Sequence, residues 1–380
     1  MRIAIIGIRG IPVTYSAFET FAETFSLEMN KRGHDVTVYC RSKYVKRSNK
    51  KYLGIKRIIL PNLERKNFGT LTHSLLSTLH ACFYTRYDVV LYLGVGSCPF
   101  SILPRIIGTK TVVHIDGLDW KRKKWGYIGR NYLKAAEYLS SILPNLTLTD
   151  SEFMREYYKK TYKKTISYIP YGYFKQSSSN LNGLLKKYNI VKSKYFVWVG
   201  RLVPENLLEE FLESFMRLRK DVKCVIVGDV LYNSSYKKYI YENCKKDSRI
   251  IRTGFISHED TLKLVSNSLA YIETKRSGGT HVSLVEAMGS GTLIISNDNE
   301  ANKGVLKDNA LFYSSKTRPF MLLSLLEKVC NAPKKYNILR LRVKRHAEIN
   351  YEWENVINQY ENLLAQILSP TKSQSTFVRK

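Results

Sequence analysis

Acidic residues are scarce in this chain of 380 residues. It has 32 Asp and Glu against 61 Lys and Arg, so its formal net charge is +29 at pH 7. An excess of this size attracts polyanions such as nucleic acid, anionic membranes and phosphorylated ligands. The total charge does not choose among these partners, and a general compositional bias explains part of it equally well.

Cysteine is also scarce, and its spacing is not that of a metal site. The six cysteines stand at positions 40, 82, 98, 224, 244 and 330, and no two form a C-x-x-C pair. The sequence therefore does not indicate a zinc site or a redox motif. In a chain of this length we expect these cysteines to be small buried hydrophobes in a reducing compartment.

Long hydrophobic runs are missing. The first apolar run spans only four residues before Gly7, which is too short for the core of a signal peptide, so we expect a cytoplasmic protein. The longest apolar stretch, residues 89–104, contains two glycines, two serines and two prolines. It predicts a buried strand and loop in place of a transmembrane helix.

The positive charge that is present is concentrated near aromatic residues. Ten basic residues and a single acid, Glu64, lie between positions 41 and 66, and a second basic cluster at 121–124 is flanked by Trp120 and Trp125. Basic residues beside aromatics suit an anionic membrane surface. They also suit single-stranded nucleic acid, and composition leaves both readings open.

The chain exceeds the size at which one hydrophobic core stops growing, and its hydrophobic content of 44% is ample for two. In the first half, a β-branched run at 2–7 ends in a glycine turn that reaches Gly10, and a helix at 18–32 and a strand at 35–40 follow. The first turn of such a βαβ unit presents backbone N–H groups where a phosphate can bind. Further buried strands are predicted at 55–60, 88–93, 111–115 and 146–149.

A polar stretch at 176–180 predicts a linker, and a second series of alternating elements follows it. Its strands are predicted at 195–200, 223–228, 250–253, 269–272 and 293–296. Strands that alternate with helices indicate parallel, doubly wound sheets. We therefore predict an α/β protein with two Rossmann-like domains facing a central cleft, where ligands of such folds bind. The predicted domains are residues 1–172 joined by a crossing helix at 351–368, residues 190–346, and a flexible tail at 369–380.

The strongest local motif is Ser277-Gly278-Gly279-Thr280, which leads into a helix that begins near Ser283. The glycines let backbone amides approach a ligand, and the start of the helix offers free N–H groups to a diphosphate. Glu286, one turn into that helix, is a candidate for accepting hydrogen bonds from ribose hydroxyls. A plain connecting turn is the alternative interpretation.

Charged residues also follow other predicted strands. Arg201 comes directly after the strand at 195–200, where its planar guanidinium suits phosphate oxygens, although a surface arginine is equally expected in so basic a protein. His114 and Asp116 alternate along another strand and are expected to share a face. A carboxylate such as Asp116 is a candidate for proton transfer, whereas a lone histidine is more often packed. His258 and His281 lack metal-like partners at short spacing, so we interpret both as structural.

Together these residues resemble the family-4 glycosyltransferases of the GT-B fold, in the rhamnosyltransferase-like branch with a distinctive N-terminal domain. The similarity spans most of the chain. It is carried by the segments at 7–12, 18–20, 116–125, 149–151, 168–172, 200–206 and 278–288.

The resemblance implies a retaining, metal-independent enzyme with no cofactor other than its nucleotide-diphosphate sugar donor. It implies that Arg201 holds the donor diphosphate, that Gly278, Gly279 and Thr280 form the phosphate-facing loop, and that Glu286 binds the ribose. Gly10 would belong to a loop that closes over the substrates. Asp116 is the first choice for a residue near the reacting centre and His114 the second.

Four departures from the family pattern bear on the substrate. Ser16-Ala17 replaces two glycines, Gly278 replaces the first glutamate of E-x7-E, Asn206 replaces a lysine, and Gly304 replaces a glutamate. A donor other than dTDP-rhamnose is therefore open.

We expect a hexosyltransferase, with rhamnosyl favoured, that acts on a polyprenyl-diphosphate-linked or glycan acceptor in the synthesis of cell-surface polysaccharide. Its basic first domain predicts peripheral binding to an anionic membrane on the cytoplasmic face. A non-catalytic relative that serves as a binding subunit of a glycan assembly complex is the alternative. Nucleic-acid binding rests only on net charge, since no recognised binding module is present, so no nucleic-acid partner is expected.

Overall fold

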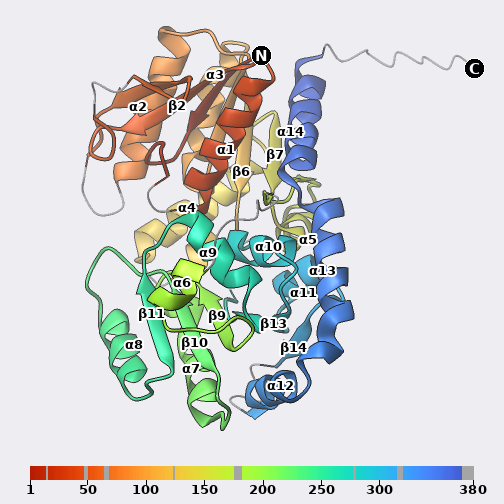
Figure 1. Cartoon of the computed structure of the whole chain (residues 1–380). Coiled ribbons are helices and arrows are strands. Elements are labelled where there is room, and N and C mark those ends of the chain that lie inside the picture. Colours follow the sequence, from red (N-terminus) through yellow and green to blue (C-terminus); the bar gives the residue numbers. More distant parts are fainter. Residues whose placement is uncertain are drawn as a thin grey trace, which may run out of the picture. The chain divides into compact units, whose positions relative to one another are not determined.

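The computed structural model describes residues 1–13, 16–46, 50–63, 68–122, 125–174, 182–276, 280–314 and 320–369. The predicted linker at 176–180 and all of the predicted tail except residue 369 lie outside these ranges. The chain divides into two compact units (Figure 1). The first comprises Met1–Asp150, Met154–Ile169 and Ile357–Lys380, and the second comprises Ser151–Phe153 and Pro170–Val356.

Within the described residues, the first unit contains a sheet with the strand order β3-β4-β2-β1-β5-β6-β7-β8. All neighbouring strands are parallel except β3 and β4, which confirms the predicted parallel sheet. The strands are β1 (Arg2–Ile6), β2 (Asp35–Arg41), β3 (Lys51–Tyr52), β4 (Ile55–Leu60), β5 (Val89–Leu93), β6 (Lys110–Ile115), β7 (Leu146–Thr149) and β8 (Ser167–Tyr168).

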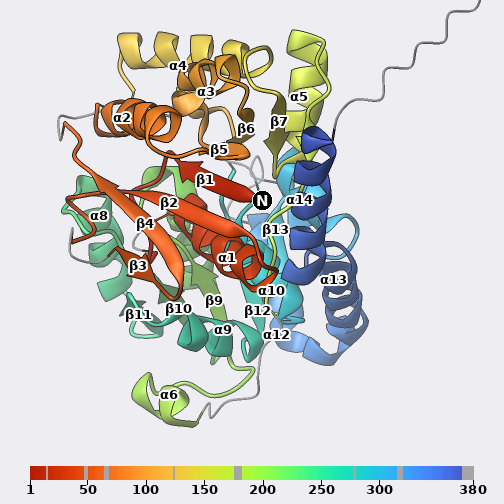
Figure 2. The ribbon, with the colours of Figure 1, turned by 90° about the horizontal axis from the view of Figure 1, so that it is seen from above.

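Helices pack on both sides of this sheet. Figure 2 shows α2, α3 and α4 on one side and α1 on the other. Helix α1 begins where the Ser16 side chain accepts a hydrogen bond from the Glu19 amide, and Phe21, Phe25 and Met29, spaced four apart, are buried. The helices are α1 (Ala17–Lys31), α2 (Gly69–Phe83), η1 (Val95–Ser101), α3 (Ile102–Ile106), η2 (Asp119–Lys121), α4 (Tyr127–Ser140) and α5 (Glu152–Tyr162).

The predicted loop within residues 89–104 is wrong. After β5 the chain turns at Gly94, with φ of +94°, and continues as the 3-10 helix η1 and the short helix α3. Glycine and proline indicated a loop, but Pro99 lies inside η1, because the fixed φ of proline is compatible with a short helical segment.

Within the described residues, the second unit contains a parallel sheet with the order β11-β10-β9-β12-β13-β14. Phe196 and Trp198 on β9 face one hydrophobic core, whereas Tyr195 and Val197 face the other, as the two-residue period of a strand requires. The strands are β9 (Tyr195–Val199), β10 (Lys223–Val227), β11 (Ile250–Gly254), β12 (Ala270–Glu273), β13 (Ile294–Asn297) and β14 (Leu311–Tyr313).

The helices of the second unit alternate with these strands, in agreement with the predicted α/β fold. They are α6 (Asn182–Lys187), η3 (Pro204–Asn206), α7 (Leu208–Arg217), α8 (Ser235–Lys245), α9 (His258–Ser266), α10 (Val282–Gly289), α11 (Glu300–Leu306), α12 (Phe320–Asn331), η5 (Pro333–Tyr336) and α13 (Asn337–Asn350).

The last described helix, α14 (Trp353–Leu368), returns to the first unit from Ile357 onward, as the crossing helix was predicted to do. Its Tyr360 ring lies 5.1 Å from the Phe21 ring, and its Glu361 carboxylate pairs with Arg32 and His34 at 2.7 Å each. Residues 351–356 belong to the second unit.

The cysteines are free thiols, and Cys40, Cys98, Cys224 and Cys244 are buried, as predicted. Cys82 and Cys330 are only partly buried. In the part of the chain that the structure describes, no helix is both long enough and apolar enough to cross a membrane.

Candidate functional site

A buried ion pair lies at the carboxyl end of β12, in the second unit. The Lys275 ammonium is 3.1 Å from Glu273 Oε2, and the two side chains are 7% and 0% exposed. Although burial alone would raise the pKa of Glu273, Lys275 and His281 lower it overall, so this carboxyl is charged. Burying two charges is costly unless they are paired and hydrogen-bonded, as these are.

The pair is tied to the first turn of α10, the helix that follows the predicted phosphate-facing loop. Lys275 Nζ donates a hydrogen bond to Ser283 Oγ at 3.1 Å, and the Tyr271 hydroxyl is within 3.1 Å of both Ser283 Oγ and Glu273 Oε2. His281, which precedes the helix, has its Nδ1 3.7 Å from Glu273 Oε1. This network fixes the amino terminus of α10, the helix end that favours anions.

Three asparagine side chains, from the end of β13, the cap of α11 and α11 itself, anchor the same segment. The amide groups of Asn297, Asn299 and Asn302 donate to the Lys275 carbonyl at 3.1 to 3.2 Å. The position of Lys275 is therefore set by its backbone as well as by its charge. No sequence motif marks Glu273, Lys275 or these amides, although Glu273 directly follows the apolar strand predicted at 269–272.

Arg201 lies just after the carboxyl end of β9, the strand that pairs with β12. A Cβ placed on Gly200 would lie 3.2 Å from Lys275 Cε, so the backbone just before Arg201 packs against Lys275. Asn206 Nδ2 donates to the Arg201 carbonyl at 2.8 Å, and the Arg201 side chain is exposed. Cations from β9 and β12 thus follow adjacent strands of one sheet.

Glu286 and Thr280 also lie at this edge of the second unit. His258 Nε2, from α9, is 2.6 Å from Glu286 Oε1, and this hydrogen bond raises the pKa of His258. Glu286 is largely buried and Thr280 is buried. Gly278 and Gly279 lie outside the described residues, so their predicted place in the loop stays a prediction.

In the first unit, His114 is buried among aromatic rings. Its ring centroid is 5.3 Å from that of Phe18 and 5.2 Å from that of Phe21, and its Nδ1 is 3.4 Å from the Tyr360 hydroxyl. The imidazole is 1% exposed, and burial lowers its pKa to about 3. His114 is therefore uncharged at neutral pH.

Asp116 lies just beyond β6 in a more open setting. Its carboxylate is 3.4 Å from Arg122 Nη2, and Arg122 Nε is 2.8 Å from Asp119. This segment is fixed by Trp120, whose indole donates to Glu137 at 3.1 Å.

Glu137 on α4 is a buried carboxylate that no sequence motif marks. Besides Trp120, it accepts hydrogen bonds from the Tyr157 and Tyr162 hydroxyls at 3.0 and 2.6 Å. Burial raises its pKa, and these hydrogen bonds only partly oppose that rise. Its position on the buried face of α4, beside Ala136, was the available sequence signal.

Gly10 is held close to β2. With φ of +144°, it occupies a backbone region that other residues rarely adopt, and an added Cβ would lie 2.9 Å from Val45 and 3.0 Å from Cys40. Arg57 Nη1 donates to the Ile11 carbonyl at 2.8 Å. The glycine loop is thus packed in place within the first unit.

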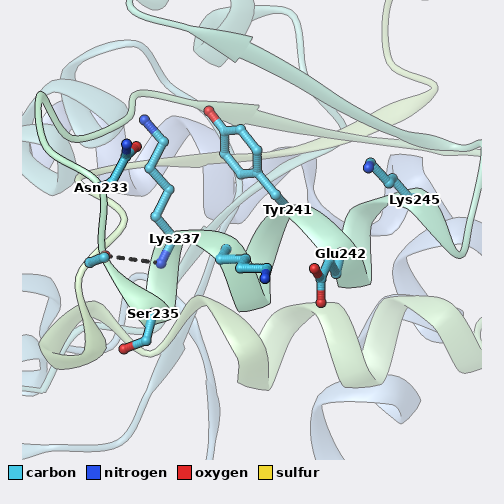
Figure 3. A pocket seen from close by; sticks show the side chains of 8 residues that line it. Asn233, Ser235, Lys237, Tyr241, Glu242 and Lys245 are labelled. Carbon is cyan, nitrogen blue, oxygen red and sulfur yellow. Dashed lines mark hydrogen bonds between the residues drawn. The ribbon is translucent and has the colours of Figure 1, made fainter.

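A hollow of about 660 Å³ lies elsewhere on the second unit, along α8 (Figure 3). Lys237, Tyr241 and Lys245 line it, with the Lys237 amide donating to Ser234 Oγ at 3.1 Å. None of the predicted site residues lines this hollow. Among the described residues, no group of three or more His, Cys, Asp and Glu side chains is placed to hold a metal ion.

Two family models match this chain. Residues 184–346 match glycosyl transferases group 1, and residues 87–173 match a domain of unknown function, DUF1972. No curated protein sequence matches the chain. The first match covers β9 to β14 and every candidate site residue of the second unit.

Solved structures resemble the chain over nearly its whole length. Sucrose-phosphate synthase from Thermosynechococcus elongatus has a TM-score of 0.84 at 14% identity and covers 96% of this chain and 98% of its own. HepE from Anabaena in complex with UDP has a TM-score of 0.78 at 14% identity, and the match covers 96% of this chain and 100% of HepE. WaaG, a glycosyltransferase involved in lipopolysaccharide biosynthesis, has a TM-score of 0.73 at 12% identity, and the match covers 95% of this chain and 99% of WaaG. These likenesses establish the two-domain GT-B fold.

Proposed function

We propose that this chain, a glycosyltransferase of the GT-B fold, transfers a hexosyl residue from a nucleotide-diphosphate sugar to a lipid-linked or polysaccharide acceptor with retention of configuration. Rhamnosyl is the favoured group, and cell-surface glycan synthesis is the favoured setting. The observation that carries the proposal is the carboxyl end of the second unit's sheet, where the exposed Arg201 and the amino terminus of α10, held in place by Lys275, follow the neighbouring strands β9 and β12.

The donor follows from the chemistry of that edge. Anions are favoured at a helix amino terminus and beside guanidinium and ammonium groups, which suits a diphosphate. Glu286 and His258 supply an acceptor and a donor of hydrogen bonds for ribose hydroxyls. HepE, one of the structural neighbours, was solved with UDP and with UDP-glucose, which supports a nucleotide-sugar donor here.

In the proposed reaction, the bond between the anomeric carbon and the diphosphate oxygen breaks, and a bond to the acceptor oxygen forms. The acceptor hydroxyl gives its proton to a carboxylate, for which Asp116 is our candidate, and the nucleoside diphosphate leaves with the extra negative charge. Arg201 and the α10 amides stabilise that charge, and so we propose that no metal is required. Asp116 is proposed to lie near the reacting centre. His114, the second choice, is neutral and enclosed, which favours a packing role.

A donor screen tests the proposal. The protein is incubated with dTDP-rhamnose, UDP-glucose, UDP-N-acetylglucosamine or GDP-mannose, with and without lipid-linked acceptor and with and without EDTA, and the released nucleoside diphosphate is measured. We expect acceptor-stimulated, EDTA-resistant release from one donor. Failure to turn over any donor would contradict the catalytic proposal, and release abolished by EDTA would contradict its metal independence.

We further propose that the enzyme binds peripherally to the cytoplasmic face of an anionic membrane. The support is the basic, aromatic-rich composition of the first unit, because lysine and arginine near aromatics bind anionic lipid surfaces. Failure to bind anionic liposomes at low salt would contradict it.

A further inference from the structure

Helix α2 of the first unit carries its polar side chains inward. His73, Ser74, Ser77 and Thr78 are buried, whereas most of its leucines and its last phenylalanine are exposed. Between Gly69 and Phe83 there is no Asp, Glu, Lys or Arg, although 24% of the chain is charged. A surface helix of a globular protein ordinarily has the opposite pattern.

Hydrogen bonds hold the polar side of α2 against the protein. Ser74 Oγ is 2.9 Å from Ser97 Oγ on η1, and Thr78 Oγ1 is 2.9 Å from the Tyr92 hydroxyl on β5. Rotating the helix to bury its leucines would break these bonds and leave buried hydroxyls without partners. The outward direction of the apolar side is therefore built into the packing of the unit.

The exposed apolar side is continuous along the helix. Leu75, Leu76, Leu79 and Phe83 follow one another at helical spacing, and Phe83 is 79% exposed. Helix α3 packs beside α2 (Figure 2). Its Ile106 is 73% exposed and adds to the apolar surface. Contiguous apolar surface of this kind marks an interaction site.

The charges around this surface point to an anionic partner. Residues 68–110 contain a single acid, Asp88, and its carboxylate lies 3.7 Å from Arg2. Lys56 on β4, Arg86 after α2 and Arg105 on α3 are exposed. A neutral apolar strip with basic flanks fits the boundary between acyl chains and anionic headgroups.

We propose that the outer side of α2, extended by Ile106 at the end of α3 and by the exposed Ile107 that follows it, is the surface on which this enzyme lies on an anionic membrane. The leucines and Phe83 enter the acyl boundary, and Lys56, Arg86 and Arg105 meet lipid phosphates. This assignment rests on the membrane association in the proposed function and specifies where it occurs.

The test compares two triple variants of the full chain. Leu76→Ser/Leu79→Ser/Phe83→Ser removes the apolar strip. Val191→Ser/Leu231→Ser/Tyr239→Ser makes matched changes at exposed positions of the second unit and serves as control. Co-sedimentation is measured with vesicles of phosphatidylcholine alone or with 30 mol% phosphatidylglycerol, at low and high salt.

We expect the α2 variant to bind anionic vesicles at least about tenfold more weakly than the parent, because each apolar side chain withdrawn from the membrane boundary weakens binding. The control variant should bind like the parent. Equal binding by the α2 variant would overturn the assignment. The assignment would also be overturned if the parent failed to bind vesicles and formed a dimer that the α2 substitutions dissociate. In that case a second copy of the chain would cover α2.

Two further measurements keep the test decisive. In the Phe83→Trp variant, brominated acyl chains should quench the fluorescence of the new tryptophan. In the control variant Leu231→Trp they should not. Absence of quenching at position 83 would count against the assignment even if the triple variant failed to fold. Donor turnover with a water-soluble acceptor should be equal in the parent and the α2 variant. Absence of donor turnover in both proteins would refute the proposed function, whereas vesicle binding tests only the assignment of α2 as the membrane-binding surface.

Discussion

Both units place a pair of opposite charges at or just after the carboxyl end of a strand, but only one pair is buried. In the second unit, Glu273 and Lys275 are 0% and 7% exposed, and they share hydrogen bonds with α10. In the first unit, Asp116 and Arg122 are 25% and 34% exposed. A buried pair is intolerant of losing one partner, whereas an exposed pair contributes little to stability. The charged groups at the end of β12 are thus held in fixed positions, whereas the Asp116 carboxylate keeps access to solvent.

The largest stability effect expected is that of Lys275→Met. The substitution leaves the Glu273 carboxylate buried without its cation, so unfolding free energy should fall by about 3–5 kcal/mol. Urea denaturation at pH 7 measures this change. Lys275→Met/Glu273→Gln should recover much of the loss, and a single variant as stable as the parent would show that the two charges do not depend on each other.

Arg201→Ala should separate activity from stability. The side chain is exposed, so folding should be little affected, whereas removal of a group that we propose stabilises the leaving diphosphate should lower kcat by about 10²–10³-fold. Initial rates of nucleoside diphosphate release measure the effect. Arg219→Ala removes another exposed arginine of the same unit and should leave the rate unchanged; equal effects would point to general charge in place of a specific contact.

Moderate acid should destabilise the first unit before the second. Burial lowers the pKa of His73 to about 4 and of His114 to about 3, below the value of about 6.5 in an unfolded chain. Their stabilising contribution is present above pH 6.5 and is lost as the pH falls, by about 2 kcal/mol each at pH 5. Glu273 has a lowered pKa too, but its contribution begins to fall only near the carboxyl value of about 4.3.

Hydrogen exchange of the backbone amides, measured at pH 7 and at pH 5, checks which unit is destabilised first. Amides of β5 and β6 should lose protection at pH 5 before those of β9 and β12. His114→Gln should flatten the pH dependence. Equal loss of protection in both units would contradict the assignment of the acid sensitivity to these histidines.

The smallest stability effect is expected for Arg122→Gln. Breaking its exposed pairs with Asp116 and Asp119 should lower unfolding free energy by no more than about 1 kcal/mol, and added salt should reduce even that difference. The same urea measurement as for Lys275→Met makes the comparison direct. A loss of several kcal/mol would mean that the Asp116 segment is as tightly built as the end of β12.

The sequence predicted the main strands well because their apolar runs are long and regular. Strands β3, β8 and β14 have two or three residues, too few for a periodic pattern, and were missed. Arg201 and Glu286 were predicted from their positions after a strand and inside a helix. Their roles stay predictions, but both lie at one edge of the second sheet.

The missed residues are charged or polar groups whose burial is a tertiary property. Glu137 looks like an ordinary helical acid until Trp120, Tyr157 and Tyr162 are seen to converge on it. Helix α2 likewise reads as apolar, but the sequence does not say which side faces outward.

The sequence by itself determined two α/β halves and the strand ends at which polar residues gather, because these features follow from local periodicity and turn chemistry. Only the tertiary structure decided which charges are buried as pairs and which side of α2 is exposed to solvent. The cost of burying a polar group depends on partners distant in the chain, such as Ser97 for Ser74 and Asn302 for Lys275. No local pattern contains that information.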